Sequence, residues 1–167
     1  HEDRGNVQRP TVGVMGLGEM GGTVAARLSA FGYAVRGWSR SPHEIENVLC
    51  FAGLDALPSF LSGCDVLVSM LPLTDSTRGI LNAATLALLP RGAFLINAGR
   101  GGHLVDADVL AALKSGQLGG AMLDVFHVEP LPNDHPYWTH PNVIVTPHIA
   151  ATTPIRDACA QIVAKIS

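Results

Sequence analysis

The chain has 167 residues, 47% of them hydrophobic and 15% charged, a composition typical of one packed domain rather than of a disordered segment. Its net charge of −3 argues against the strongly basic surface by which proteins bind nucleic acid or anionic membranes. Its three cysteines lie far apart and form no zinc-binding or disulfide pattern, so we expect a reducing, cytoplasmic environment.

The amino-terminal residues 1–10 lack an apolar segment, and the longest apolar stretch, 80–98, is interrupted by Pro90-Arg91-Gly92. We therefore expect neither a signal peptide nor a membrane-spanning helix. Because the chain begins with His1 rather than Met, we also expect that the natural amino terminus precedes it.

Hydrophobic runs bounded by turn residues alternate along the chain with segments of helical periodicity. The pattern predicts strands over residues 11–15, 34–38, 65–70, 93–97, 120–124 and 143–145. It predicts helices over residues 19–31, 54–62, 83–89 and 106–114, and a closing helix from about residue 153. Nearly continuous apolar strands such as Val66-Leu67-Val68 are typical of a parallel sheet covered on both faces. The sequence therefore predicts an α/β fold with a doubly wound parallel sheet in a three-layer αβα sandwich.

A glycine pattern of the form G-x-G-x-x-G follows the first predicted strand and is made by Gly16, Leu17, Gly18, Glu19, Met20 and Gly21. Such glycines let the backbone turn tightly and approach a pyrophosphate, whose charge is stabilised by the amino terminus of the next helix. The same glycines could form a plain tight turn. However, strand, pattern, helix and second strand follow one another in the order of a Rossmann-type domain. The sequence therefore predicts one dinucleotide-binding domain over residues 1–167.

The end of the second predicted strand indicates which dinucleotide is bound. An NAD-binding domain usually has Asp or Glu here to hydrogen-bond the ribose 2′-hydroxyl, whereas this chain has Trp38, Ser39, Arg40 and Ser41. The Arg40 guanidinium and its two flanking hydroxyls suit a phosphate instead. NADP is therefore predicted, with NAD less favoured, although Arg40 could also be an ordinary solvated side chain.

Three chemically suited side chains follow later strands, at the edge of the sheet where ligands bind in open α/β folds. Arg100 stands in a glycine-rich turn after strand 93–97, Glu129 follows strand 120–124, and His148 follows strand 143–145. Reduction of a keto acid needs a hydride donor, a proton donor and a cation that orients the carboxylate. We therefore predict that Arg100 binds the carboxylate and that His148 donates the proton.

A carboxylate at Glu129 would stabilise the imidazolium form of His148. Each of these residues also has a plainer interpretation, as a surface charge, a loop residue before proline, or a histidine satisfied by the backbone. His127 and His140 lie close enough in the sequence to compete with His148 for the role of acid.

Taken together, the motifs resemble the D-isomer-specific 2-hydroxyacid dehydrogenases, and among them the glyoxylate/hydroxypyruvate reductases. The resemblance extends from Thr11 to about Ile162. It is carried by the glycine pattern and by residues 69–74 with Thr77, 97–101, Asp106, 120–126, 129–132 and 146–150.

The resemblance implies roles for individual residues. Arg100 would bind the substrate carboxylate and carbonyl, Glu129 would pair with His148, and His148 would donate or accept the proton. Asp124 and the backbone of Ala98 would hold the nicotinamide carboxamide. Further cofactor contacts would come from Leu71, Pro72, Thr77, Gly99, Arg100 and His148.

The resemblance also implies a longer protein, because family members have a substrate domain that is missing or truncated here. We expect the chain alone to bind NADP(H) better than it turns over a 2-keto acid or 2-hydroxy acid. We also expect a homodimer formed through the helix at 106–114 and the long loop, residues 127–142, which is rich in Pro and His. Two alternatives are a β-hydroxyacid dehydrogenase of the 3-hydroxyisobutyrate type, which shares the segments 13–21 and 69–72, and a non-catalytic, dinucleotide-sensing domain of the corepressor type.

Overall fold

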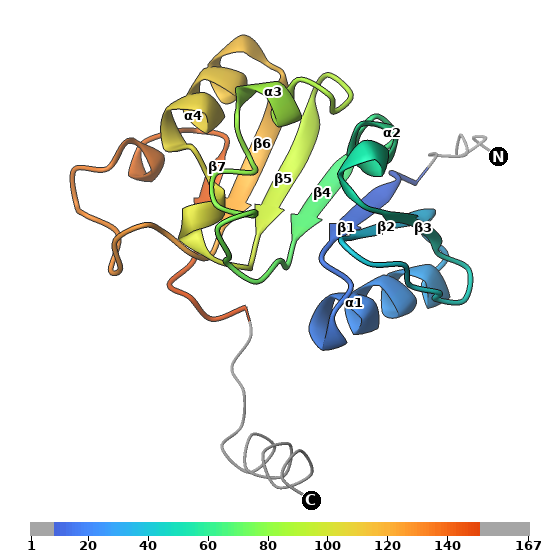
Figure 1. Cartoon of the computed structure of the whole chain (residues 1–167). Coiled ribbons are helices and arrows are strands. Elements are labelled where there is room, and N and C mark those ends of the chain that lie inside the picture. The colour runs from blue at the N-terminus through green and yellow to red at the C-terminus, as the bar shows by residue number, and fades with distance from the viewer. Residues whose placement is uncertain (1–8, 151–167) are drawn as a thin grey trace, which may run out of the picture.

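The computed structural model describes residues 9–150. Their centre is a seven-stranded parallel sheet with the strand order β3-β2-β1-β4-β5-β6-β7 (Figure 1). The strands are β1 (Val12–Met15), β2 (Val35–Ser39), β3 (Leu49–Ala52), β4 (Val66–Ser69), β5 (Ala93–Asn97), β6 (Leu118–Leu123) and β7 (Val143–Val145).

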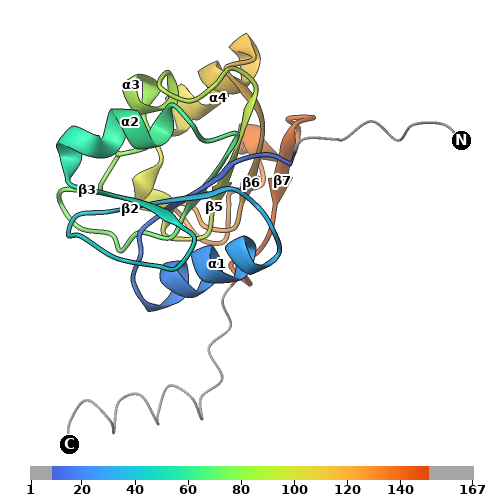
Figure 2. The same ribbon diagram turned by 90° about the vertical axis from the view of Figure 1, so that its right-hand side faces the viewer.

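Helices lie on both faces of this sheet, as Figure 2 shows from its edge. α1 (Glu19–Ala30) covers one face, and α2 (Leu57–Leu61), α3 (Ala83–Leu86) and α4 (Asp106–Ser115) cover the other. Three short 3-10 turns complete the elements: η1 (Leu54–Ala56), η2 (Gly101–His103) and η3 (Pro136–Trp138). The predicted three-layer, doubly wound α/β fold is confirmed.

The core forms because the central strands are apolar on both faces. All four residues of β1 are buried, as parallel strands between two helical layers must be. A small hydrophobic cluster that includes Val14 and Ala25 packs beneath α1. A larger cluster on the opposite face includes Phe60, Leu95 and Leu113.

Most predicted elements differ from the observed ones by a residue or two at their ends. β3 was not predicted, because this short edge strand has no regular pattern of burial and Leu49 is largely exposed. The predicted helix 54–62 is divided into η1 and α2, and the predicted helix 83–89 ends at Leu86. The predicted closing helix lies outside the described residues.

The strand order creates a crevice at one point of the sheet. The chain runs from β1 outward to β2 and β3, then returns to the other side of β1 and continues from β4 to β7. The loops after β1 and β4 therefore diverge, which is where open α/β sheets bind ligands. Within the described residues no helix is long and apolar enough to cross a membrane.

Candidate functional site

The glycine pattern after β1 has the geometry of a phosphate cradle. Gly16 has φ +102°, a left-handed conformation that favours glycine, and a Cβ there would lie 2.9 Å from the backbone of Met70. A Cβ on Gly21 would lie 1.8 Å from the carbonyl oxygen of Gly16, so this glycine lets α1 pack against the loop. A Cβ on Gly18 would meet nothing within 4 Å. The space above Gly18 is therefore open to a ligand.

The amino terminus of α1 faces this open space. Gly18 is its N-cap residue and provides no side-chain cap. The helix is 12 residues long, so its positive dipole end favours an anion placed above Gly18.

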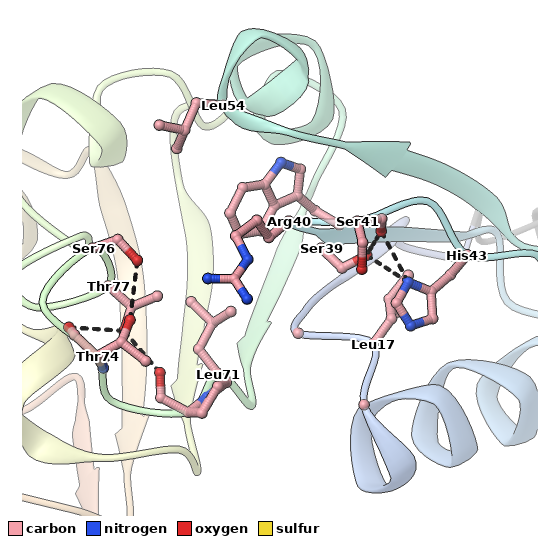
Figure 3. A pocket seen from close by; sticks show the side chains of 14 residues that line it. Leu17, Ser39, Arg40, Ser41, His43, Leu54, Leu71, Thr74, Ser76 and Thr77 are labelled. Carbon is pink, nitrogen blue, oxygen red and sulfur yellow. Dashed lines mark hydrogen bonds between the residues drawn. The ribbon is translucent and has the colours of Figure 1, made fainter.

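A cleft of about 310 Å³ extends from the cradle across the ends of β1, β2 and β4 (Figure 3). Ten of its lining residues were predicted from the sequence, namely Gly16, Leu17, Gly18, Trp38, Ser39, Arg40, Ser41, Leu71, Pro72 and Thr77. Four were missed: His43, Leu54, Thr74 and Ser76. His43 lies only two residues beyond the predicted segment 38–41. Like Arg40, its side chain can carry positive charge, and this was the signal in the sequence that could have identified it.

No lining residue of this cleft is acidic, and Arg40 and His43 are the ones that can carry positive charge. The Arg40 side chain is exposed and points into the cleft from the end of β2 (Figure 3). Trp38, two residues before it, is buried and donates from Nε1 to the carbonyl of Gly53 at 2.8 Å. The burial and hydrogen bond of Trp38 thus fix the end of β2, where the turn that carries Arg40 and His43 begins.

A turn of hydroxyl side chains forms the opposite wall of the cleft. Thr77 donates from Oγ1 to the carbonyl of Pro72 at 2.7 Å, and it accepts the backbone N–H of Thr74 at 2.8 Å. These bonds fix the turn after β4 that forms this wall of the cleft (Figure 3).

A second cavity, of about 340 Å³, contains the predicted reactive residues. It is lined by Leu73, Arg78, Arg100, Gly101, Gly102, Phe126, His127, Glu129 and His148. The structure therefore brings the three predicted catalytic side chains together from the ends of β5, β6 and β7. Arg78, a second cation of this cavity, was not predicted.

Glu129 and His148 form a hydrogen-bonded pair. His148 Nδ1 lies 2.7 Å from Glu129 Oε2, and the backbone N–H of Phe126 donates to Glu129 Oε1 at 3.0 Å. The hydrogen bond from His148, followed by that from Phe126, lowers the pKa of the Glu129 carboxyl. The carboxylate is therefore charged near neutrality and can stabilise an imidazolium.

The segment that carries His148 is held by a buried carboxylate at the end of β6. Asp124 accepts hydrogen bonds from Thr146 Oγ1 at 2.5 Å and from the backbone N–H groups of Ile149 and Ala150 at 2.9 Å each. Burial raises the pKa of Asp124, but the hydrogen bonds together lower it by a larger amount, so the net shift is downward. His148 itself has φ +55°, which turns the chain toward Asp124.

The turn that carries Arg100 is fixed by its backbone. Arg100 donates its N–H to Nδ1 of the buried His103 at 3.2 Å, and its carbonyl accepts from Asn97 Nδ2 at 3.1 Å. Burial lowers the pKa of His103 and keeps it neutral, so that Nδ1 remains an acceptor. A Cβ on Gly101 would lie 1.9 Å from the backbone of Phe126, so only glycine fits there.

The competing histidines have other partners. Nε2 of His127 lies 2.9 Å from the carbonyl of Leu104, although the side chain borders the second cavity. His140 accepts the backbone N–H of Asn142. Of the histidines in residues 9–150, His148 is the one that hydrogen-bonds Glu129.

The remaining predicted cofactor residues line neither cavity. Glu19 and Met20 are exposed in the first turn of α1, and Gly21 packs beneath the loop. Ala98 and Gly99 directly follow β5, and the buried Asp124 directly follows β6. Residues 9–150 contain no group of His, Cys, Asp and Glu side chains that could hold a metal ion.

Comparison with known proteins gives close relatives. The chain is 52% identical to glyoxylate/hydroxypyruvate reductase A of Serratia proteamaculans over 93% of its length, and this alignment covers 50% of the relative. A D-isomer specific 2-hydroxyacid dehydrogenase from Xanthobacter autotrophicus Py2, crystallised with NADPH and MES, superposes with a TM-score of 0.90 at 52% identity, covering 94% of this chain and 65% of that one.

A further structure is an NADPH-dependent glyoxylate/hydroxypyruvate reductase from Sinorhizobium meliloti, in complex with NADP and sulfate. It superposes with a TM-score of 0.88 at 48% identity, covering 94% of this chain and 51% of that one. The chain thus spans about half the length of the curated relatives it matches.

The family model described as the NAD binding domain of D-isomer specific 2-hydroxyacid dehydrogenases matches residues 2–150. This match confirms the predicted resemblance and sets aside the β-hydroxyacid dehydrogenase alternative. With its parallel sheet, glycine cradle and Arg-Glu-His cavity, the chain belongs to the D-isomer specific 2-hydroxyacid dehydrogenase family.

Proposed function

We propose that this chain is the NADP-binding part of an oxidoreductase that reduces a small 2-keto acid, such as glyoxylate or hydroxypyruvate, to the 2-hydroxy acid. The observation that carries the proposal is the cavity in which Arg100 accompanies the hydrogen-bonded pair of Glu129 and His148. The printed names of the relatives, glyoxylate/hydroxypyruvate reductase, support the same substrate class.

The residues present fit a dinucleotide. The open space above Gly18 and the amino terminus of α1 suit its pyrophosphate. Arg40 and the hydroxyl of Ser41 suit a ribose 2′-phosphate, whereas the Ser39 hydroxyl is bonded to the carbonyl of Ser41 and holds the turn in place. The cleft has no carboxylate to hold a 2′-hydroxyl or to repel that phosphate. NADP is therefore favoured over NAD.

The bound nicotinamide would supply the hydride for the reduction. The planar guanidinium of Arg100 would hold the substrate carboxylate and orient the carbonyl. His148, whose Nδ1 is held by Glu129, would present Nε2 to the carbonyl oxygen and donate the proton that the developing alkoxide needs. The charged Glu129 would stabilise the imidazolium before the transfer. Asp124 and the backbone of Ala98 remain the proposed neighbours of the carboxamide, and Gly99 remains a proposed cofactor contact.

The cofactor assignment is tested by titrating the chain with NADPH and with NADH, followed by fluorescence or calorimetry. NADPH should bind more tightly, and Arg40→Asp should weaken NADPH by about ten- to a hundredfold, because a charge-assisted hydrogen bond is lost and a repulsion is added. Arg27→Asp, at the other end of α1, changes the net charge equally and should leave the preference intact. Equal affinity for both dinucleotides in the unaltered chain would contradict the assignment.

The enzymatic assignment is tested by turnover of glyoxylate with NADPH in the full-length protein. His148→Ala should lower kcat by about 10²–10⁴-fold, as expected for removal of a general acid, while NADPH still binds. His140→Ala is the matched control, since His140 borders neither cavity. A protein that binds NADPH yet shows no turnover would instead support the dinucleotide-sensing, corepressor-type alternative.

We further propose that the chain forms one dinucleotide-binding domain whose partner substrate domain lies elsewhere in the protein, and that the protein is a cytoplasmic homodimer. Exposed apolar side chains of the long loop, of β7 and of the segment after it, namely Val128, Trp138, Ile144 and Ile149, support a covered face. The free thiols of Cys50 and Cys64 are compatible with a reducing compartment. Sedimentation of the protein at several concentrations tests the dimer.

A further inference from the structure

His43 is a titratable residue of the cofactor cleft to which the proposed reaction assigns no role. It follows β2 by four residues and lines the cleft beside Ser39, Arg40 and Ser41 (Figure 3). Its Nδ1 lies 2.9 Å from Ser39 Oγ and 2.9 Å from the carbonyl oxygen of Ser41. The imidazole is exposed to solvent, yet these two contacts hold it in place.

The partners of Nδ1 determine where the ring carries its proton. The hydroxyl of Ser39 donates to the carbonyl of Ser41 at 2.7 Å, so its hydrogen is already used. A carbonyl oxygen can only accept. Both contacts of His43 Nδ1 are therefore satisfied when Nδ1 carries a hydrogen. In the neutral ring Nε2 is then a bare acceptor.

A bare Nε2 repels a phosphate oxygen, whereas a protonated Nε2 donates a hydrogen bond to it and adds a positive charge. A phosphate monoester carries up to two negative charges, and Arg40 supplies one positive charge to this cleft. We propose that His43 is a specificity-determining residue that takes up a proton from solvent when the 2′-phosphate of NADP enters the cleft. This inference rests on the proposed binding of NADP.

The bound phosphate itself would supply the charge that favours a protonated ring. Arg40 shares the cofactor cleft with His43, and Glu44, Glu46 and Cys50 border a neighbouring hollow of about 520 Å³ that His43 also lines. Arg40 can neutralise one of the two negative charges of the phosphate, and the remaining negative charge would favour a proton on Nε2 of His43.

The proposal is tested by isothermal titration calorimetry of the chain with adenosine 2′,5′-bisphosphate, and with adenosine 5′-monophosphate for comparison. Neither probe has a nicotinamide, so neither extends to His148. Measurements at about pH 8 keep the phosphates dianionic, because their second pKa is about 6. Two buffers with different enthalpies of ionisation reveal the number of protons taken up.

We expect the bisphosphate to bind with uptake of up to about one proton, and the monophosphate with none. By linkage, the affinity for the bisphosphate should then fall by as much as about tenfold between pH 7.5 and pH 8.5. His43→Lys should bind the bisphosphate without proton uptake, because its ammonium is charged throughout this range. His43→Gln should bind it about three- to tenfold more weakly and also without uptake, and His140→Gln should behave like the unaltered chain.

The two proposals fail in different ways. A bisphosphate that binds no more tightly than the monophosphate contradicts the proposed preference for NADP. A bisphosphate that binds more tightly but without proton uptake, or with the same uptake in His43→Gln, leaves the NADP assignment standing and overturns the role of His43.

Discussion

His148 is supported by two carboxylates that act in different ways. Glu129 contacts the ring directly, with 2.7 Å between Nδ1 and Oε2. Asp124 does not contact the ring but accepts hydrogen bonds from the residues on either side of it, Thr146, Ile149 and Ala150. One carboxylate therefore hydrogen-bonds the imidazole, and the other fixes the segment that carries it.

Replacement of Glu129 by Gln should impair catalysis without removing the hydrogen bond from the backbone N–H of Phe126. The amide keeps the shape of the side chain but lacks the charge that stabilises an imidazolium. We expect kcat for reduction to fall by about 10²-fold or more, because the general acid loses its charged partner. Turnover of glyoxylate with NADPH by the full-length protein measures this effect, and an unchanged kcat would show that the charge of Glu129 has no part in proton transfer.

Replacement of Asp124 by Asn should destabilise the segment that carries His148. The amide nitrogen cannot accept the N–H of Ala150 or Ile149, so at least one of these part-buried hydrogen bonds is lost, at a cost of about 1 kcal/mol. The folded pKa of Asp124 is lowered, so its contribution to stability is complete above the ordinary carboxyl value of 3.8 and is lost as the pH falls through the lowered value.

Urea unfolding of both proteins at neutral pH and below pH 4 tests this prediction. The difference in the free energy of unfolding between them should shrink in acid, because the unaltered protein loses the charged carboxylate there. A difference that is constant with pH would mean that the charge of Asp124 contributes nothing.

In the connection from β1 to α1, Gly21 is needed for packing, whereas Gly18 borders the space proposed for the ligand. The Cβ of an alanine at position 21 would overlap the carbonyl of Gly16, whereas one at position 18 would enter open space. Gly21→Ala should therefore displace α1 and lower the free energy of unfolding by about 1–3 kcal/mol, as overpacking does. Gly18→Ala should leave stability nearly unchanged and weaken NADPH binding, because its methyl group occupies space proposed for the pyrophosphate.

Chemical denaturation and NADPH titration of the two variants distinguish these effects. Equal loss of stability in both would show that the space above Gly18 is needed by the fold itself. Unaltered NADPH binding by Gly18→Ala would place the pyrophosphate elsewhere.

For the whole molecule, cofactor binding should appear as a gain in thermal stability. A ligand at a hundred times its Kd stabilises the folded state by about 2.7 kcal/mol, which corresponds to several degrees in Tm for a domain of this size. At equal concentrations NADPH should raise Tm more than NADH does, and Arg40→Asp should abolish the difference. A thermal scan with each dinucleotide measures this, and an equal shift from both would argue against a 2′-phosphate site.

The sequence by itself determined the fold class and most of the cofactor cleft. Strands that are buried on both faces are recognisable from their apolar runs, and the glycines of 16–21 are required by local backbone geometry, so both leave a signal in adjacent residues. Arg40 could be predicted for the same reason, since the end of β2 and its charge are read from consecutive positions.

The tertiary structure decided what depends on the ends of separate strands. The residues alone offered His127, His140 and His148 as candidate acids, and only the family resemblance implied that His148 pairs with Glu129. The structure shows this pair because β6 and β7 lie side by side. The hydrogen bonds of Asp124 to a segment more than twenty residues later and the pairing of the edge strand β3 with β2 left no local pattern. These contacts join groups that are distant along the chain, so their geometry exists only once the sheet has formed.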